Sequence, residues 1–288
     1  APSSRMAIGG QGHLDPAGLT PGHQTRLHEH LAAVADAQDG FAARGLLEQQ
    51  EALVRLEPLA AAGQIRLVRK RVNEGKAMAL NDAIPLTRGE LVFVMDADAI
   101  PVPEILKTMV PHFRSPRVGG VTGNPRVVNR DSFLSKLQAI EFASIISLMR
   151  RAQRVWGRIM TMSGVVGIFR RSALFDVGLY SPDMATEDID LTWRLQMRHW
   201  DVRYESRAVM WMRVPQSLRG LWLQRRRWAL GLSQVLTRHA RQLRQYRHRR
   251  FWPVLVEATL SVIWAYSYVF LTAVWVTSWS EWKSCWWI

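Results

Sequence analysis

The chain has 288 residues, of which 48% are hydrophobic, and it contains 19 Gly and 13 Pro. This composition excludes a collagen-like or low-complexity chain and predicts that most of the sequence folds. The formal net charge of +14 favours an anionic partner such as nucleic acid, lipid headgroups or a phosphorylated substrate. Cys285 is the single cysteine, which excludes a disulfide framework and a cysteine-based zinc site. The 13 Trp indicate a membrane interface or a carbohydrate path.

The first 45 residues differ from the rest of the chain, because Phe41 is their single aromatic residue among many Gly, Ala, His, Gln and Pro. We expect residues 1–45 to be poorly ordered, and they hold no apolar run typical of a secretory signal or a membrane anchor. Apolar residues then recur at helical spacing within 46–62, and residues 65–68 predict a short strand. The α/β pattern of the chain begins in this segment.

A short apolar run at residues 90–95 predicts a strand of the kind found in parallel sheets that are covered on both faces. It ends directly in Asp96-Ala97-Asp98, so both carboxylates follow the carboxyl end of a strand, where open α/β sheets bind ligands. The pair could hold a divalent cation that bridges to a diphosphate. The alternative is that both are ordinary turn residues, which is the commoner case for an isolated Asp-x-Asp.

Two further segments carry candidate binding and catalytic groups. Asn73-Glu-Gly-Lys76 predicts a glycine turn at a helix start, where backbone amides and Lys76 could hold a phosphate or a base. Thr186-Glu-Asp188 predicts a capping residue followed by acids in the first helical turn. Those acids either stabilise the helix dipole or provide a general base, and the segment alone favours neither interpretation.

Two amphipathic helices are predicted, one within 132–156 and one around 218–236, and both could lie on a bilayer surface. The second contains Gln224-Arg-Arg-Arg-Trp228. Its arginines could attract lipid headgroups, or one of them could neutralise a leaving diphosphate, because guanidinium binds phosphate in a bidentate manner.

A transmembrane helix is predicted at residues 258–279, a run of 22 residues without charge that is long enough to cross about 30 Å of hydrocarbon. The basic cluster from Arg238 to Arg250 precedes it and predicts the cytoplasmic flank. The alternative is a buried core helix, which is seldom apolar on every face. The predicted organisation begins with an atypical N-terminus (1–45) and a catalytic domain (46–215). An interface helix with its basic segment (216–250), a membrane helix (251–279) and a short tail (280–288) follow.

These motifs, in the order Asn-x-Gly-Lys, Asp-x-Asp, Thr-Glu-Asp and Gln-x-x-Arg-Trp, resemble those of the membrane-bound family 2 glycosyltransferases that make β-linked polysaccharides. The sequence is most similar to bacterial poly-β-1,6-N-acetyl-D-glucosamine synthases. The segments that carry this likeness are Pro116–Gly119, Val121–Arg126, Ser163-Gly164, Phe169–Leu174, Met184–Asp190 and Gly220–Trp222. The resemblance covers about residues 46–272 and implies a GT-A-type (Rossmann-like) α/β fold.

The resemblance also implies the roles of single residues. Asp96 and Asp98 would hold the UDP moiety with Mg²⁺ or Mn²⁺, near Lys76. Asp188 would be the base that deprotonates the acceptor hydroxyl. Trp228 would stack on the acceptor sugar, with Gln224 and Arg227 beside the acceptor and the diphosphate. The implied substrates are UDP-N-acetylglucosamine and the growing polysaccharide. The implied surroundings are inner-membrane lipids, a small membrane subunit and an export apparatus, with the catalytic domain on the cytoplasmic side.

The sequence departs from the family before Leu46, where neither the first strand with its Pro-x-x-Asn-Glu segment nor the Asp-Gly-Ser turn that holds uridine is found. We therefore expect a partial chain or replaced ends. Three other functions are weighed: nucleic-acid binding, a catalytically inactive partner in a synthase complex, and synthesis of another polymer of the hyaluronan, chitin or cellulose type. Nucleic-acid binding leaves the paired acids Asp96 and Asp98 unexplained, because carboxylates repel phosphate without a metal.

Overall fold

The structure, a computed structural model, describes residues 5–9, 56–70, 72–155 and 157–285. Most of the segment predicted to be poorly ordered, and the start of the helix predicted within 46–62, lie outside the described residues. The chain divides into two compact units, 1–231 and 232–288, which are considered separately below.

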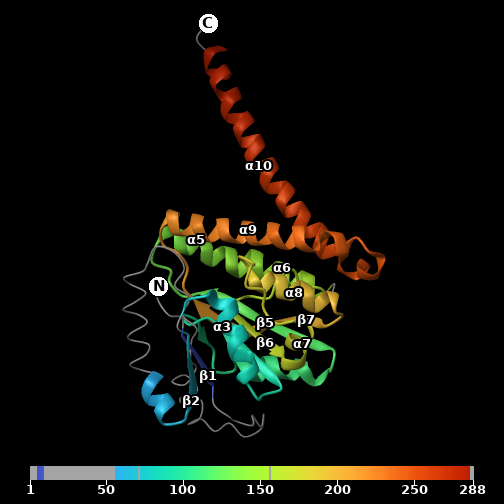
Figure 1. The fold of residues 1–288 in the computed structure, drawn as a ribbon. Coiled ribbons are helices and arrows are strands. Elements are labelled where there is room, and N and C mark those ends of the chain that lie inside the picture. The colour runs from blue at the N-terminus through green and yellow to red at the C-terminus, as the bar shows by residue number, and fades with distance from the viewer. Residues whose placement is uncertain (1–4, 10–55, 71, 156, 286–288) are drawn as a thin grey trace. The chain divides into compact units, whose positions relative to one another are not determined.

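A mixed five-stranded sheet forms the centre of the first unit, with the order β3-β6-β5-β7-β4 (Figure 1). Its strands are β3 (Leu91–Met95), β4 (Ile100–Pro101), β5 (Val118–Val127), β6 (Val166–Arg170) and β7 (Asp201–Met212). β5 and β7 are parallel, whereas the pairs β3–β6, β5–β6 and β4–β7 are antiparallel. The predicted strand at residues 90–95 is thus present, but its expected parallel pairing is wrong. An apolar run reports that both faces of a strand are covered and carries no information on the direction of the neighbouring strand.

Two hydrophobic layers cover β3 from opposite sides, which explains its unbroken apolar sequence. Val92 and Val94 belong to a core shared with helices α3, α7 and α8. Met95 belongs to a second core with α4 and strands β5 and β7. Adjacent residues point to opposite faces, so an apolar residue is needed at every position.

Helical elements alternate with the strands along the described part of the chain. The α-helices are α3 (Gly75–Ala83), α4 (Ile105–Met109), α5 (Phe133–Glu141), α6 (Ser147–Val155), α7 (Arg171–Asp176), α8 (Glu187–Met197), α9 (Leu218–Leu243) and α10 (Trp252–Cys285), and a π-helical turn, η3 (Phe142–Ile146), joins α5 to α6. The 3₁₀ turns are η1 (Ile84–Leu86), η2 (Val110–Arg114) and η4 (Tyr246–Phe251).

A separate two-stranded sheet pairs β1 (Arg5–Gly9) with β2 (Ile65–Arg69) in antiparallel register. The strand predicted at 65–68 is therefore confirmed, and residues 56–61 just before it are helical. Residues 5–9, within the segment expected to be poorly ordered, form this first strand. Pairing with a strand some 60 residues later is a long-range contact, which local composition does not reveal.

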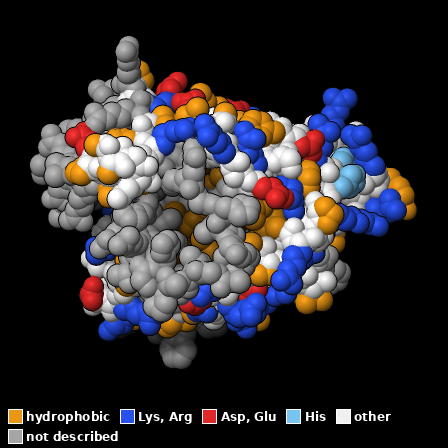
Figure 2. Space-filling view, turned by 90° about the horizontal axis from the view of Figure 1, so that it is seen from below, with side chains coloured by type: hydrophobic (Ala, Val, Ile, Leu, Met, Phe, Trp, Pro, Cys, Tyr) orange, Lys and Arg blue, Asp and Glu red, His pale blue; other side chains and the backbone are white. Residues whose placement is uncertain are grey.

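The segments predicted as amphipathic helices are helical. Ser132 is the N-cap of α5, and its hydroxyl accepts from the Ser135 N–H at 3.1 Å while the Ser135 hydroxyl accepts from the Ser132 N–H at 3.1 Å. The π-helical turn η3 interrupts the helix that the sequence predicted as continuous over 132–156. Large apolar side chains on these helices are exposed, including Phe133 (83%), Leu148 and Trp222 (67% each). Basic side chains are spread widely over the face in Figure 2 and acidic ones are sparse, in keeping with the net charge.

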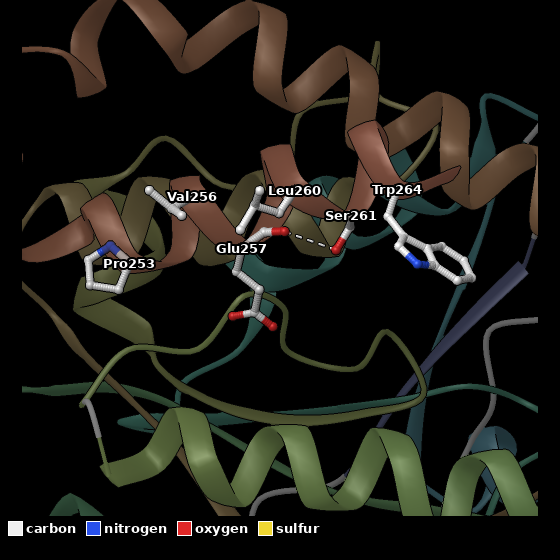
Figure 3. A pocket seen from close by; sticks show the side chains of 6 residues that line it. All are labelled: Pro253, Val256, Glu257, Leu260, Ser261 and Trp264. Atoms are coloured by element: carbon white, nitrogen blue, oxygen red, sulfur yellow. Dashed lines mark hydrogen bonds between the residues drawn. The ribbon is translucent and has the colours of Figure 1, made fainter. Parts of the chain in front are cut away.

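In the second unit, α10 contains the segment predicted to span a membrane. Residues 246–278 are long and apolar enough to do so by length and composition, and this is the one such helix among the described residues. A shallow depression on its side is lined by Pro253, Val256, Glu257, Leu260, Ser261 and Trp264 (Figure 3). The Ser261 hydroxyl donates to the Glu257 carbonyl at 2.9 Å, a hydrogen bond that satisfies this polar group within the helix.

A buried carboxylate with two basic partners stabilises an irregular part of β7. The residues 205–208 bulge between the pairs that Tyr204 and Val209 make with β5. Glu205 is 3% exposed, and its carboxylate accepts from Arg207 Nε at 2.9 Å and lies 3.0 Å from His112 Nε2. Burial alone would raise the pKa of Glu205, but the bonds from Arg207 and His112 lower it to about 2.

Glu205→Gln should therefore reduce the free energy of unfolding by about 2 kcal/mol at neutral pH, since charge-assisted hydrogen bonds are lost. The pKa of Glu205 is depressed in the folded state, so its contribution is complete above its ordinary value of 4.5 and disappears as the pH falls toward 2. Urea unfolding of both proteins across this range should show the difference shrinking toward acid. Glu104→Gln, which breaks an exposed pair with Lys107, should cost less than about 0.5 kcal/mol.

Candidate functional site

The backbone of Gly164 joins the candidate cation and the candidate base. Its carbonyl accepts from Lys76 Nζ at 3.0 Å, and its N–H donates to Asp188 Oδ2 at 3.0 Å. Lys76 also forms a very short ion pair with Asp96. The structure thus brings together Lys76, Asp96 and Asp188, which the sequence placed in three separate motifs.

Each of these side chains is positioned by a local feature of the chain. The Asn73 side chain accepts from the Gly75 N–H at 3.0 Å, and Gly75 has a φ of +84°, which favours glycine. This turn places Lys76 in the first turn of α3, as the sequence predicts. Asp96 follows β3, and its N–H donates to the Val165 carbonyl at 3.2 Å, which holds it beside the segment that contains Gly164.

One face of α8 is fixed to residues 159–164 by polar side chains four residues apart. Gln196 accepts from the Ile159 N–H at 3.1 Å, and Thr192 accepts from the Met162 N–H at 2.9 Å. Asp188 continues this row with its bond from Gly164. Because residues at i and i+4 share a helix face, the row sets the position of Asp188 relative to the loop.

The three acids in the first turn of α8 have different surroundings. Asp190 is fully buried and accepts from Arg194 Nε at 2.7 Å and from the Ser181 hydroxyl at 2.7 Å, so it is structural. Asp188 faces Gly164, as described above. Glu187 lies within the electrostatic influence of Lys76 and Arg227. The sequence could not separate these three environments.

The prediction that Thr186 caps α8 with its side chain is wrong. Thr186 occupies the N-cap position, but its side chain makes no capping hydrogen bond, and its Oγ1 is buried without a hydrogen-bond partner. The Thr186 side chain packs against α9, where a Cβ on Gly231 would lie 2.6 Å from the Cβ of Thr186. Packing against a neighbouring helix has overridden a local preference that the sequence displays.

The charges of the site shift one another's pKa. Burial, then the charge of the adjacent Asp188, raise the pKa of Glu187 to about 7. Burial also raises the pKa of Asp188, against the opposing effect of Lys76 and of the two backbone N–H groups that bind it. Burial would lower the pKa of Lys76, but Asp96, Glu187 and Asp188 raise it above its ordinary value.

Asp96 and Asp98 fit a divalent-cation site that substrate oxygens would complete. Burial and the like charge of Asp96 raise the pKa of Asp98, so negative charge is concentrated at this turn. Among the described residues there is no group of three or more His, Cys, Asp or Glu side chains that could hold a metal ion. Two carboxylates together with substrate phosphates are a donor set that Mg²⁺ commonly uses, and Mn²⁺ has similar preferences.

The remaining predicted residues, Gln224, Arg227 and Trp228, lie on α9 in the same unit. Arg227 lowers the pKa of Glu187, which places its charge near the start of α8. The Oε1 atom of Gln224 is buried without a hydrogen-bond partner. Trp228 is half-buried and packs edge-on against Phe142, with ring centroids 6.5 Å apart.

Sequence reasoning missed three residues at this site. Gly164 acts through its backbone, and Ser163-Gly164 was noted as a family likeness alone. Arg150 on α6 is 8% exposed, its Nη1 has no hydrogen-bond partner, and burial lowers its pKa while Tyr204 and Asp188 oppose that effect. Arg213 lowers the pKa of Asp98. In a chain with 38 Lys and Arg, no local pattern distinguishes Arg150 or Arg213 from surface arginines.

The chain belongs to glycosyl transferase family group 2, because the model of that family matches residues 91–288. Several relatives carry the name poly-beta-1,6-N-acetyl-D-glucosamine synthase, among them the following two. The one from Staphylococcus epidermidis is 41% identical over 202 residues, which are 70% of this chain and 49% of the relative. The one from Staphylococcus aureus (strain COL) is 40% identical over 195 residues, or 67% and 47% of the two chains. The chain therefore spans about half the length of the curated relatives it matches.

Among solved structures, the mannosyltransferase PcManGT from Pyrobaculum calidifontis in complex with GDP-Man and Mn²⁺ is similar to this chain. The two share 25% sequence identity and a TM-score of 0.58, over 73% of this chain and 55% of the mannosyltransferase. Together with the family match, this confirms the predicted GT-A-type α/β fold.

Gly231→Ala should destabilise the first unit by about 1–3 kcal/mol, because the added methyl group overlaps Thr186. The same change in an unobstructed helix would stabilise by up to about 1 kcal/mol, so the sign of the effect is diagnostic. Chemical unfolding of the two proteins measures it. Adding Thr186→Gly to Gly231→Ala should recover part of the loss, and a stabilised single variant would contradict the contact.

Proposed function

We propose that the chain is the catalytic part of a processive, inverting glycosyltransferase that polymerises N-acetylglucosamine from UDP-N-acetylglucosamine into a β-1,6-linked polysaccharide. The observation that carries this proposal is the connection of Asp188 to Lys76 and Asp96 through Gly164. A half-buried carboxylate thus lies next to a lysine, which suits a diphosphate, and close to Asp96, which suits the divalent cation of that diphosphate. The names of the relatives at about 40% identity support the choice of sugar and linkage.

The donor end of the site is formed by Lys76, Asp96 and Asp98. A divalent cation, when bound there with the donor, would supply positive charge to the departing diphosphate. Lys76 and Arg227 add fixed positive charge from α3 and α9. Departure of the diphosphate builds negative charge while the sugar becomes oxocarbenium-like, so cations placed in advance lower the barrier.

The acceptor end centres on Asp188. A raised pKa suits a general base, because proton transfer is most efficient when that pKa approaches the working pH. Removal of the acceptor proton by Asp188 allows the oxygen to attack the anomeric carbon opposite the diphosphate. One such displacement on an α-linked donor gives a β-linked product.

Buried polar atoms without partners lie on the segments around Asp188. They are Thr186 Oγ1, Gln224 Oε1 and Arg150 Nη1. Buried polar groups normally have hydrogen-bond partners, and those that lack them are candidates for binding a ligand. Thr186 Oγ1 packs against Gly231, whereas Gln224 Oε1 and Arg150 Nη1 are groups that the hydroxyls of a sugar have the chemistry to satisfy.

The membrane arrangement is part of the same proposal. The exposed apolar side chains of α5, α6 and α9 suit the interface of the inner membrane of a bacterium, and α10 suits a transmembrane helix. The basic segment from Arg238 to Arg250 favours a cytoplasmic position for the catalytic domain, where nucleotide sugars are available. The proposed partners of the chain are a small membrane subunit and an export apparatus.

Asp188→Asn should reduce polymer synthesis by about 100-fold or more and leave UDP binding nearly unchanged, because the amide keeps the shape but cannot accept the proton. The test measures incorporation of labelled N-acetylglucosamine alongside UDP titration. A variant that keeps more than about a tenth of the wild-type rate would show that Asp188 is not the base.

Asp98→Ala should weaken metal-dependent UDP binding, because a hard oxygen ligand is lost next to the diphosphate. Calorimetric titration of UDP with and without Mn²⁺ separates the metal-dependent part of the affinity. Glu104→Gln serves as an exposed acidic control on the same unit. Equal affinities of wild type and Asp98→Ala in the presence of Mn²⁺ would refute the ligand role.

A further inference from the structure

A chain of contacts connects α5 to the indole of Trp228 on α9. Arg225 Nη1 donates to Glu141 Oε1 at 2.7 Å, and Nη2 donates to the second carboxylate oxygen, so the pair is bidentate. The same guanidinium lies 4.6 Å from the centroid of the Trp228 ring. The ring also meets Phe142 edge-on, with an interplanar angle of 73°. α5 and the first part of α9 lie side by side (Figure 1).

Hydrogen bonds also fix α5, which carries Glu141, to the segment that precedes α9. Gln138 Nε2, one turn earlier on α5, donates to the Pro215 carbonyl at 2.8 Å, just before α9 begins. Asn129 and Val214 exchange two hydrogen bonds of 2.9 Å in the same region. The π-helical turn begins at Phe142, directly after Glu141, and such turns are frequent at functional sites.

The Glu141–Arg225 pair affects the orientation of Trp228 more than the stability of the fold. An exposed ion pair contributes little to stability, and Glu141 and Arg225 are about one-third exposed, so their main effect is on orientation. The bidentate bond fixes the plane of the guanidinium, which then lies over one face of the indole. Phe142 restrains the ring edge. A half-buried tryptophan that would otherwise sample several rotamers is held in one.

We infer that Glu141 and Arg225 are positioning residues that hold the Trp228 indole in the orientation that receives the acceptor sugar. This inference rests on the proposed function, because it requires an acceptor at Trp228. Arg225 follows Gln224 in the motif but was not among the residues expected to act there. Glu141 lies 84 residues away and belongs to no motif.

The test uses the full chain in lipid nanodiscs and a β-1,6-linked N-acetylglucosamine pentasaccharide as the acceptor probe. Pentasaccharide and UDP binding are each titrated, and transfer from UDP-N-acetylglucosamine is followed at varied concentrations of both substrates. The variants are Glu141→Gln, Arg225→Gln, Arg225→Lys and the double Gln variant. Arg226→Gln, at the exposed neighbouring position, is the matched control.

Each single variant should raise the pentasaccharide Kd and the acceptor KM by about tenfold, a difference of about 1.4 kcal/mol. The UDP Kd and the donor KM should stay within about twofold of wild type, a separation that general misfolding would not produce. Arg225→Lys should recover little, because lysine lacks the planar fork. The double variant should be no weaker than the weaker single variant, since both changes break one connection.

Unchanged acceptor constants in both Gln variants, with an active wild type, would overturn the positioning role and leave the proposed function intact. Donor and acceptor constants that deteriorate together would also overturn it in favour of a structural role. A wild-type chain that neither binds the pentasaccharide nor transfers to it would contradict the proposed function, and the inference with it.

Discussion

The two hydrogen bonds made by the backbone of Gly164 are the contacts on which the candidate site depends. Lys76 lies 88 residues before Gly164 and Asp188 lies 24 residues after it. Because both bonds are made by one residue, its covalent geometry limits how far the ammonium can lie from the carboxylate. A Cβ at this position would come within 3.2 Å of Asp188 Oδ2, so glycine also provides the space for the approach. Lys76 in turn reaches Asp96, which ties the end of β3 to the start of α8.

This connection concentrates more negative than positive charge around Lys76. Asp96, Glu187 and Asp188 all act on its ammonium, and Arg227 is a second cation near Glu187. Buried charges are costly unless they are paired, so an excess of acids favours uptake of a proton. The pKa of Glu187 is accordingly raised to about 7 by burial and by the neighbouring charge of Asp188. If the proposed donor diphosphate binds with a divalent cation, the charge of that cation would offset part of this excess of acids.

The sequence predicted the strands at residues 65–68 and 90–95 and the glycine turn before Lys76, because those depend on local patterns. The apolar run before Asp96 and the glycine turn before Lys76 are of this kind. It did not predict the antiparallel pairing of β3 or the strand at residues 5–9, which depend on neighbours remote in the chain. Nor could it identify Gly164, whose function lies in its backbone, or Arg150, whose burial depends on tertiary packing. Local patterns therefore predict which residues are candidates for the site, and long-range contacts determine how those residues lie relative to one another.

The start of α8 is held by buried side-chain hydrogen bonds and not by a side-chain cap from Thr186. Asp188, Thr192 and Gln196 bind the segment that contains Gly164 along one face of the helix. Asp190 and Arg194 bind each other on another face, and Arg194 also donates to the Leu179 carbonyl at 2.6 Å. Two rows of buried polar bonds, each with a spacing of four residues, fix both the rotation and the position of the helix. A side-chain cap would add little to such a helix, and the Thr186 side chain instead packs against α9 beside Gly231.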